Sequence, residues 1–181
     1  MKHSHNYLSL FMTFCVVVFI SNLAYAQRPT RSAINLGLSV KWANMNIGAD
    51  SPEEYGNYYA WGETTTKSSF TEYNYTYSSN PTTLPLSKDA ANANWGGSWR
   101  MPTKAEQDEL RTECTWTWTT QNGVNGYKVT SKTNGNSIFL PAAGYRSSDL
   151  YYVGSEGNYW GGSLCPDVSD YAYNLDFVSG T

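Results

Sequence analysis

Few residues of this chain could carry acid–base or nucleophilic chemistry. Its two histidines, His3 and His5, lie in a segment, residues 1–26, that has the pattern of a signal peptide. Without that segment the chain has no imidazole, which excludes Ser-His-Asp, Cys-His and histidine–metal sites. Two acidic pairs could still do acid–base work without imidazole: Glu53/Glu54 and Asp167/Asp170.

The remaining cysteines and the C-terminal acids predict neither a metal site nor a cofactor. Cys114 and Cys165 could form a disulfide in an oxidising compartment, or stay as separate thiols. Asp167, Asp170 and Asp176 supply loop oxygens, but calcium needs six to eight oxygen ligands in close array. We therefore interpret these acids as solvated loop residues.

The segment 145–177 has the composition of a binding face. Tyrosine and tryptophan give large amphipathic contact area, and Ser, Gly and Asn adapt their hydrogen bonds. The alternative is that these rings pack in an aromatic core. The segment has five acids against one arginine, which favours cationic or neutral ligands. The predicted ring anchors are Tyr151, Tyr152, Tyr159 and Trp160, with Arg146, Asp149 and Asn158 as hydrogen-bonding partners.

The N-terminus predicts export to the periplasm, the cell surface or the medium. Lys2 is followed by the apolar run 8–20 and by a cleavage pattern at Ala24-Tyr25-Ala26. The apolar run is shorter than the about 20 residues of a spanning helix, so no membrane span is expected in the mature chain. That chain has 11 basic and 15 acidic residues, a formal charge of −4, which disfavours nucleic acid as a partner.

The elements that must position these residues begin with short strands and loops. Alternation predicts a strand over 34–43 and another over 58–62, with a turn-rich loop over 46–56 between them. The polar stretch 64–85 is expected to be a long excursion. A short helix over 88–94, capped by Ser87, should then lead into the main scaffold.

That scaffold is the stretch 92–110. Trp95 and Trp99 bracket a Gly96-Gly97 bend, and Arg100 and Pro102 lead to a capping box of Thr103 and Glu106. We expect Trp99 to be largely buried near the helix start. On the helix, Ala105, Leu110 and Cys114 should face the core. Its solvent face is predicted to carry Lys104, Gln107, Asp108 and Arg111.

The clearest strand pattern follows this helix. Residues 115–119 alternate strictly, so Trp116 and Trp118 should point to one face, with Trp116 largely buried. A turn is expected over 121–126. A hairpin should join 127–130 to 137–140 across Asn134-Gly135-Asn136.

Six collinear segments resemble the Fibrobacter succinogenes major paralogous domain family. They are GLSVKWA (37–43), YGNYYAWGET (55–64), NWGGSWRMPTKAE (94–106), CTWTWT (114–119), NGNSIFLPAAGYR (134–146) and YWGG (159–162). The resemblance implies a compact, loop-rich α+β domain over 34–181, after a polar lead at 27–33. It implies a fold similar to C-type-lectin-like domains, with a twisted, mostly antiparallel sheet, one main helix and a minor one.

The resemblance also implies two departures from the family. Its members continue into a further strand, so a final strand is expected to be missing after Thr181, leaving an open sheet edge. They often have a cysteine where this chain has Met45, so Cys114 would lack that partner. The related formylglycine-generating enzymes use two cysteines near the C-terminus, whereas Cys165 stands alone there.

These observations predict an exported, non-catalytic module that binds a glycan or a protein at the bacterial cell surface. The alternatives are a structural module of a surface assembly and, less favoured, a histidine-independent enzyme. Neither a cofactor nor a metal is expected.

Overall fold

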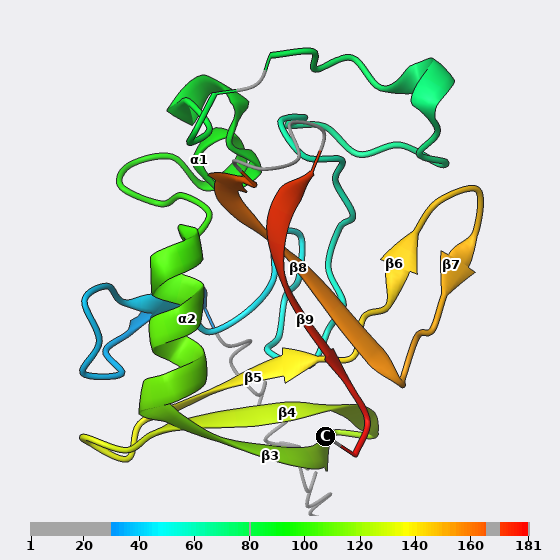
Figure 1. The fold of residues 1–181 in the computed structure, drawn as a ribbon. Coiled ribbons are helices and arrows are strands. Elements are labelled where there is room, and N and C mark those ends of the chain that lie inside the picture. Colours follow the sequence, from blue (N-terminus) through cyan, green and yellow to red (C-terminus); the bar gives the residue numbers. More distant parts are fainter. Residues whose placement is uncertain (1–29, 80, 166–170, 181) are drawn as a thin grey trace, which may run out of the picture.

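The computed structural model describes residues 30–79, 81–165 and 171–180. The predicted signal peptide, residues 27–29, Asp167 and Asp170 lie outside these ranges. The described chain is an α+β fold with mostly antiparallel strands, two α-helices and long loops, as predicted (Figure 1). The strands form four small sheets in the described ranges rather than one twisted sheet. In these ranges no helix has the length and apolar character needed to cross a membrane.

A three-stranded antiparallel sheet forms one end of the molecule. It orders β3 (Cys114–Gln121), β4 (Val124–Ser131) and β5 (Ser137–Pro141) as β3-β4-β5. The β3–β4 connection is the two-residue turn Asn122-Gly123, where both φ angles are positive at 48° and 83°. Asn-Gly suits such a primed turn, whose twist matches that of the strands. The predicted strand over 115–119 and the predicted hairpin between 127–130 and 137–140 are confirmed, whereas the turn expected over 121–126 is confined to Asn122-Gly123.

Helix α2 (Lys104–Glu113) lies beside this sheet and begins at the predicted cap. The Thr103 hydroxyl accepts a hydrogen bond from the Glu106 amide at 3.3 Å, and the Glu106 carboxylate accepts one from the Thr103 amide at 2.7 Å. The predicted faces of the helix are wrong at one position each: Gln107 was expected in solvent and Ala105 in the core. Gln107 is buried and Ala105 is exposed, because Gln107 lies three residues before Leu110 and therefore on its face of the helix.

The preceding helix α1 (Ala90–Trp95) starts later than predicted. The short 3-10 turn η2 (Leu86–Lys88) comes first, and Asp89 rather than Ser87 caps α1. One Asp89 carboxylate oxygen accepts from the amides of Ala91 and Asn92, and the other accepts from the Met101 amide at 2.8 Å. This buried carboxylate thus joins the start of α1 to the chain that enters α2.

Two predicted N-terminal strands are largely wrong. Of the strand expected over 34–43, only Ile34 and Trp42–Ala43 form ladder pairs, as parts of β1 (Ala33–Ile34) and β2 (Trp42–Ala43), which pair with each other. The chain bends back between them from Gly37, whose φ is +73° and which packs against Thr133. Residues 58–60 run without a ladder partner, and 61–62 form a turn.

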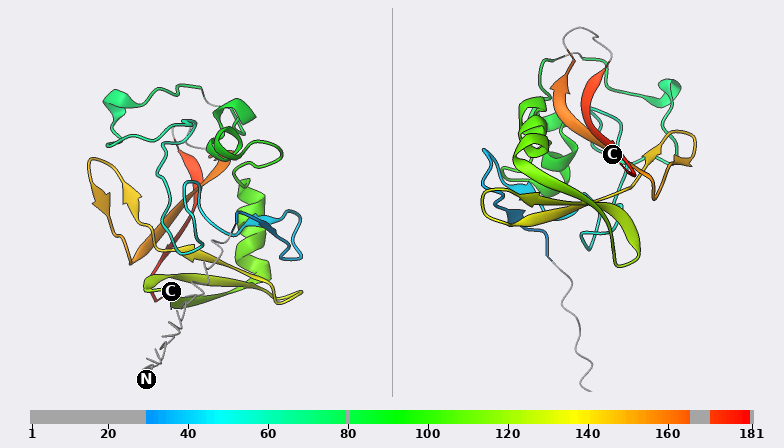
Figure 2. Two further views of the ribbon diagram at one scale, coloured as in Figure 1. Left: turned by 180° about the vertical axis from the view of Figure 1, so that it is seen from behind. Right: turned by 60° about the horizontal axis from the view of Figure 1, so that its bottom comes forward.

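The C-terminal part consists of two antiparallel pairs. Short β6 (Tyr145–Arg146) pairs with β7 (Leu150–Tyr151), and long β8 (Glu156–Leu164) pairs with β9 (Ala172–Val178). The 3-10 turn η1 (Glu72–Asn74) lies in the excursion before α1. Figure 2 shows β8 and β9 crossing between the three-stranded sheet and the N-terminal loops.

The main core lies between α2, the sheet and β9. Leu36, Leu110 and Val129 are fully buried there. Trp116 and Trp118 point to the same side and contact Tyr127 and Phe177, as their alternation predicts. Trp116 is nevertheless half-buried rather than largely buried, and it lies on one of the two edge strands of its sheet.

The aromatic turn and the cysteines complete the scaffold. Trp95 and Trp99 meet edge to face at 5.1 Å, and the Arg31 guanidinium lies 5.0 and 5.6 Å from their ring centres. Trp99 is half-buried, not largely buried as predicted. Cys114 is a buried free thiol and Cys165 a half-buried one, so the predicted disulfide alternative is wrong.

Candidate functional site

The predicted site residues fall into two groups in the structure. Arg146, Asp149, Tyr151 and Tyr152 lie on the β6–β7 hairpin and the turn after it. Asn158, Tyr159 and Trp160 lie on β8 and line a cleft. Arg146 also lines this cleft, whereas Tyr151 and Tyr152 do not. The single binding face expected from the sequence is therefore two neighbouring surfaces.

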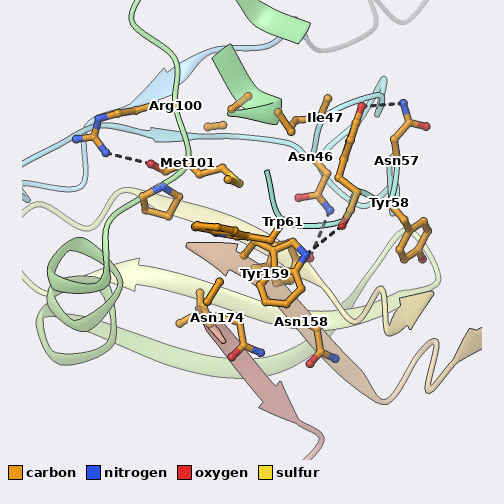
Figure 3. A pocket seen from close by; sticks show the side chains of 18 of the residues that line it. Asn46, Ile47, Asn57, Tyr58, Trp61, Arg100, Met101, Asn158, Tyr159 and Asn174 are labelled. Atoms are coloured by element: carbon orange, nitrogen blue, oxygen red, sulfur yellow. Dashed lines mark hydrogen bonds between the residues drawn. The ribbon is translucent and has the colours of Figure 1, made fainter. Parts of the chain in front are cut away.

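The cleft has a volume of about 1790 Å³ and lies between β8–β9, β2, the loop 45–61 and the turn 95–101. Aromatic rings and amide side chains from these segments line it (Figure 3). Sites for small molecules usually enclose about 300–1,000 Å³. The cleft can therefore hold a ligand longer than one small molecule.

Three buried polar atoms on the wall of the cleft have no hydrogen-bond partner among the described residues. They are the indole Nε1 of Trp42, the Oε1 of Gln107 and the Nδ2 of Asn158. Buried polar atoms are almost always paired, because leaving one unpaired costs about 1–3 kcal/mol. Two donors and one acceptor, all on residues that line one cleft, thus lack a partner within the described ranges.

Gln107 connects the helix to this cleft. Its side chain is only 2% exposed, and its Nε2 donates to the Tyr159 carbonyl at 3.2 Å. That hydrogen bond fixes the amide, so Oε1 keeps its position against Gly161 of β8. The sequence prediction missed Gln107 and Trp42, although the spacing of Gln107 from Leu110 could have placed it on the buried face.

Tyr159 is a structural wall of the cleft rather than an exposed anchor. Its hydroxyl donates to the Pro141 carbonyl at 2.6 Å and accepts from Asn46 Nδ2 at 3.4 Å. Its ring stacks on Phe177 at 6.0 Å. Burial raises the pKa of this hydroxyl well above its usual range, with the Asn46 hydrogen bond opposing the shift. The side chain therefore stays neutral and fixes the loop 45–61 against β5.

Trp160 is the exposed ring of the cleft. Its side chain is 41% exposed, and its Nε1 donates to the Tyr59 carbonyl at 3.0 Å. The neighbouring Trp61 is buried instead and donates to the Gly161 carbonyl at 2.8 Å. The Trp160 ring is thus held in one orientation with a large area available to a ligand.

Arg146 stands where the hairpin meets the cleft. Its guanidinium lies 5.5 Å from the Tyr58 ring centre and donates to the Ser68 carbonyl at 3.2 Å. The Tyr58 hydroxyl donates to the Ala143 carbonyl at 2.6 Å. Burial raises the pKa of Tyr58, and the Arg146 charge partly opposes this shift. Arg146 is therefore part of a fixed cluster at the rim.

Two of the charged residues that line the cleft form an ion pair with each other. Arg100 makes two hydrogen bonds to the Glu106 carboxylate, at 2.6 and 2.8 Å. The Arg100 hydrogen bonds lower the pKa of Glu106, with burial opposing them, so this pair remains ionised. The described ranges contain no group of three or more His, Cys, Asp or Glu side chains that could hold a metal ion.

The β6–β7 hairpin presents a cluster of tyrosine rings. Tyr145 stacks on Tyr151 at 5.5 Å and lies 5.8 Å from Tyr152. Asp149 is exposed in the hairpin turn, where its carbonyl accepts from the Ser147 amide at 2.9 Å. These residues come together as predicted, but apart from Asn158 and Trp160.

No protein family, curated protein or solved structure matches the chain.

Proposed function

We propose that this protein is an exported, non-catalytic binding module and that its cleft binds a neutral glycan chain at the cell surface. The observation that carries the proposal is the set of three unpartnered polar atoms in an aromatic cleft. Such atoms are costly in the free protein and become favourable when a ligand completes their hydrogen bonds.

The chemistry of the wall fits a sugar. Trp42 and Asn158 need acceptors and Gln107 needs a donor, and each sugar hydroxyl can act as both. The Trp160 ring provides an apolar surface for the face of a sugar ring. The volume of the cleft suits several linked sugars better than one.

The charges favour a ligand without acidic groups. The Arg100 guanidinium is held by Glu106, and Arg146 is turned toward the Tyr58 ring and the Ser68 carbonyl. An anionic sugar would have to compete with these contacts and would also meet a chain of negative net charge. We therefore expect neutral glycans to bind more tightly than uronate or sulfated glycans.

A binding role is also supported by the first acidic pair. Glu53 accepts from Gln121 and Asn122, and Glu54 accepts from the Asp50 amide. The Asn122 hydrogen bond lowers the pKa of Glu53 despite some burial. The two carboxylates are thus committed to different structural contacts, which an acid–base pair facing one substrate would not be.

A glycan array tests this function with the purified chain. We expect signals from neutral oligosaccharides, reduced at least tenfold in Trp160→Ala and in Asn158→Ala. Tyr73→Ala is the matched control, because this ring is 92% exposed on η1 and does not line the cleft. Absence of any glycan signal, or signals unaffected by both cleft variants, would favour the structural-module alternative.

A further inference from the structure

The β6–β7 hairpin carries a second surface that the cleft does not include. The Tyr145 ring contacts those of Tyr151 and Tyr152, and five exposed apolar side chains in all lie along 145–153. They are Tyr145, Leu150, Tyr151, Tyr152 and Val153, which we call the tyrosine patch. Clustered exposed apolar side chains on a protein surface commonly mark a site of interaction. Only Tyr145 of this patch also lines the cleft.

The tyrosine patch is held in a strained conformation. Tyr152 has a φ of +57°, which bulky side chains rarely adopt, and its ring is 56% exposed. Its carbonyl accepts three hydrogen bonds, from the amides of Ser155 and Glu156 and from the Ser155 hydroxyl. Strain that the surrounding structure maintains is often found at functional sites. Here the strained backbone presents a large ring to solvent.

The base of the hairpin is fixed as well. The Gly144 amide donates to the Glu156 carbonyl at 2.7 Å, and Gly144 forms a parallel bridge with Gly157. Gly144 has a φ of +62° and approaches the Tyr151 carbonyl so closely that a Cβ would clash with it. The rings of the patch therefore need little ordering when a partner binds, which lowers the cost of association.

An exposed acid beside the tyrosine patch favours a cationic partner. Asp149 is exposed in the hairpin turn. Arg146 is the one basic residue in the sequence 145–165, and its guanidinium is directed to Tyr58 and the Ser68 carbonyl. Tyrosine faces attract guanidinium groups, which also stack on them in a planar geometry that ammonium groups lack.

We propose that the tyrosine patch docks an arginine-bearing segment of a partner protein. In this arrangement guanidinium groups stack on Tyr151 and Tyr152, and one pairs with Asp149. The inference is independent of glycan binding in the cleft, because neither Tyr151 nor Tyr152 lines the cleft.

Fluorescence anisotropy with labelled hexa-arginine and hexa-lysine peptides tests this proposal at near-physiological salt. We expect hexa-arginine to bind more tightly than hexa-lysine. The double variant Tyr151→Ala/Tyr152→Asn should weaken hexa-arginine binding by roughly tenfold, the size of two exposed cation–π contacts. Asp149→Asn should weaken it by a smaller factor, and Tyr73→Ala should leave it unchanged.

The asparagine variant separates binding from folding. Asparagine tolerates a left-handed backbone better than tyrosine, so Tyr152→Asn alone should melt at the same temperature as the wild type or higher. Equal binding of both peptides, no binding of either, or binding that survives the double variant would overturn the proposal. A neutral-glycan signal that the double variant abolishes would also overturn it, because the patch would then belong to the glycan site.

Discussion

The three-stranded sheet and the cleft differ in whether their buried polar atoms are hydrogen-bonded. In the sheet, the buried Ser131 hydroxyl donates to the Leu36 carbonyl at 2.5 Å and accepts from the amides of Thr133 and Asn134. In the cleft, Trp42, Gln107 and Asn158 each leave a buried polar atom without a partner among the described residues. The buried Ser131 hydroxyl is therefore satisfied within the chain, whereas the three atoms of the cleft are the ones that the proposed ligand would pair.

The largest expected effect compares one tryptophan from each region. Trp116→Ala should lower the free energy of unfolding by about 3 kcal/mol, because its ring contacts Tyr127 and Phe177 in the core. Trp160→Ala should cost about 1 kcal/mol or less, because its side chain is 41% exposed and makes one hydrogen bond. Urea unfolding of both variants measures the difference. Equal losses in the free energy of unfolding would show that Trp160 is a packing residue like Trp116, and the two regions would then not differ in this respect.

A smaller effect is expected at the start of α2, which joins the two regions. Thr103→Ala should cost about 1 kcal/mol, because the Glu106 amide loses its capping acceptor. Thr112→Ala is the matched control on the same helix, where the hydroxyl makes only a 3.4 Å contact with the Glu109 carbonyl. Thermal melts should separate the two variants. If both lose the same stability, the cap does not fix this helix.

The smallest effect depends on pH. Glu106→Gln keeps a capping side chain but loses the Arg100 ion pair, which should cost about 0.5–1 kcal/mol at pH 7 because Arg100 is partly exposed. The pKa of Glu106 is lowered in the folded protein, so this stabilisation is present above its ordinary value of 4.5. It is lost as the pH falls through the lowered pKa. Melting curves should therefore converge toward acidic pH, and a gap that stays constant would contradict the ion-pair account.

Local chemistry made much of the scaffold predictable. The Asn122-Gly123 turn lies within the turn expected over 121–126, Thr103 with Glu106 specifies a helix start, and strict alternation specifies the direction of Trp116. Each of these signals acts within a few residues. The strand predicted over 34–43 is wrong because the chain bends at Gly37, close to Thr133. Alternation within the segment cannot indicate a contact with a residue so distant in sequence.

The cleft was less predictable because it is made by distant segments. Trp42 lies on β2, Gln107 on α2 and Asn158 on β8, and no sequence spacing brings them together. Sequence composition identified the tyrosine-rich segment, but it did not show that part of this segment lines the cleft whereas Tyr151 and Tyr152 do not. It also placed Tyr159 among the ring anchors of the binding face, since a hydroxyl partner such as the Pro141 carbonyl leaves no local signature.

The most direct test of the central claim is to measure melting temperature and glycan affinity together in Asn158→Leu. The Nδ2 of Asn158 is buried without a partner, so an apolar side chain should remove a destabilising group from the free protein. The same change removes a donor that the ligand needs. We expect the variant to melt above the wild type and to bind neutral glycans at least tenfold more weakly. A variant that melts at a lower temperature than the wild type, or that binds these glycans as tightly, would contradict the claim that a glycan supplies the missing hydrogen-bond partners in the cleft.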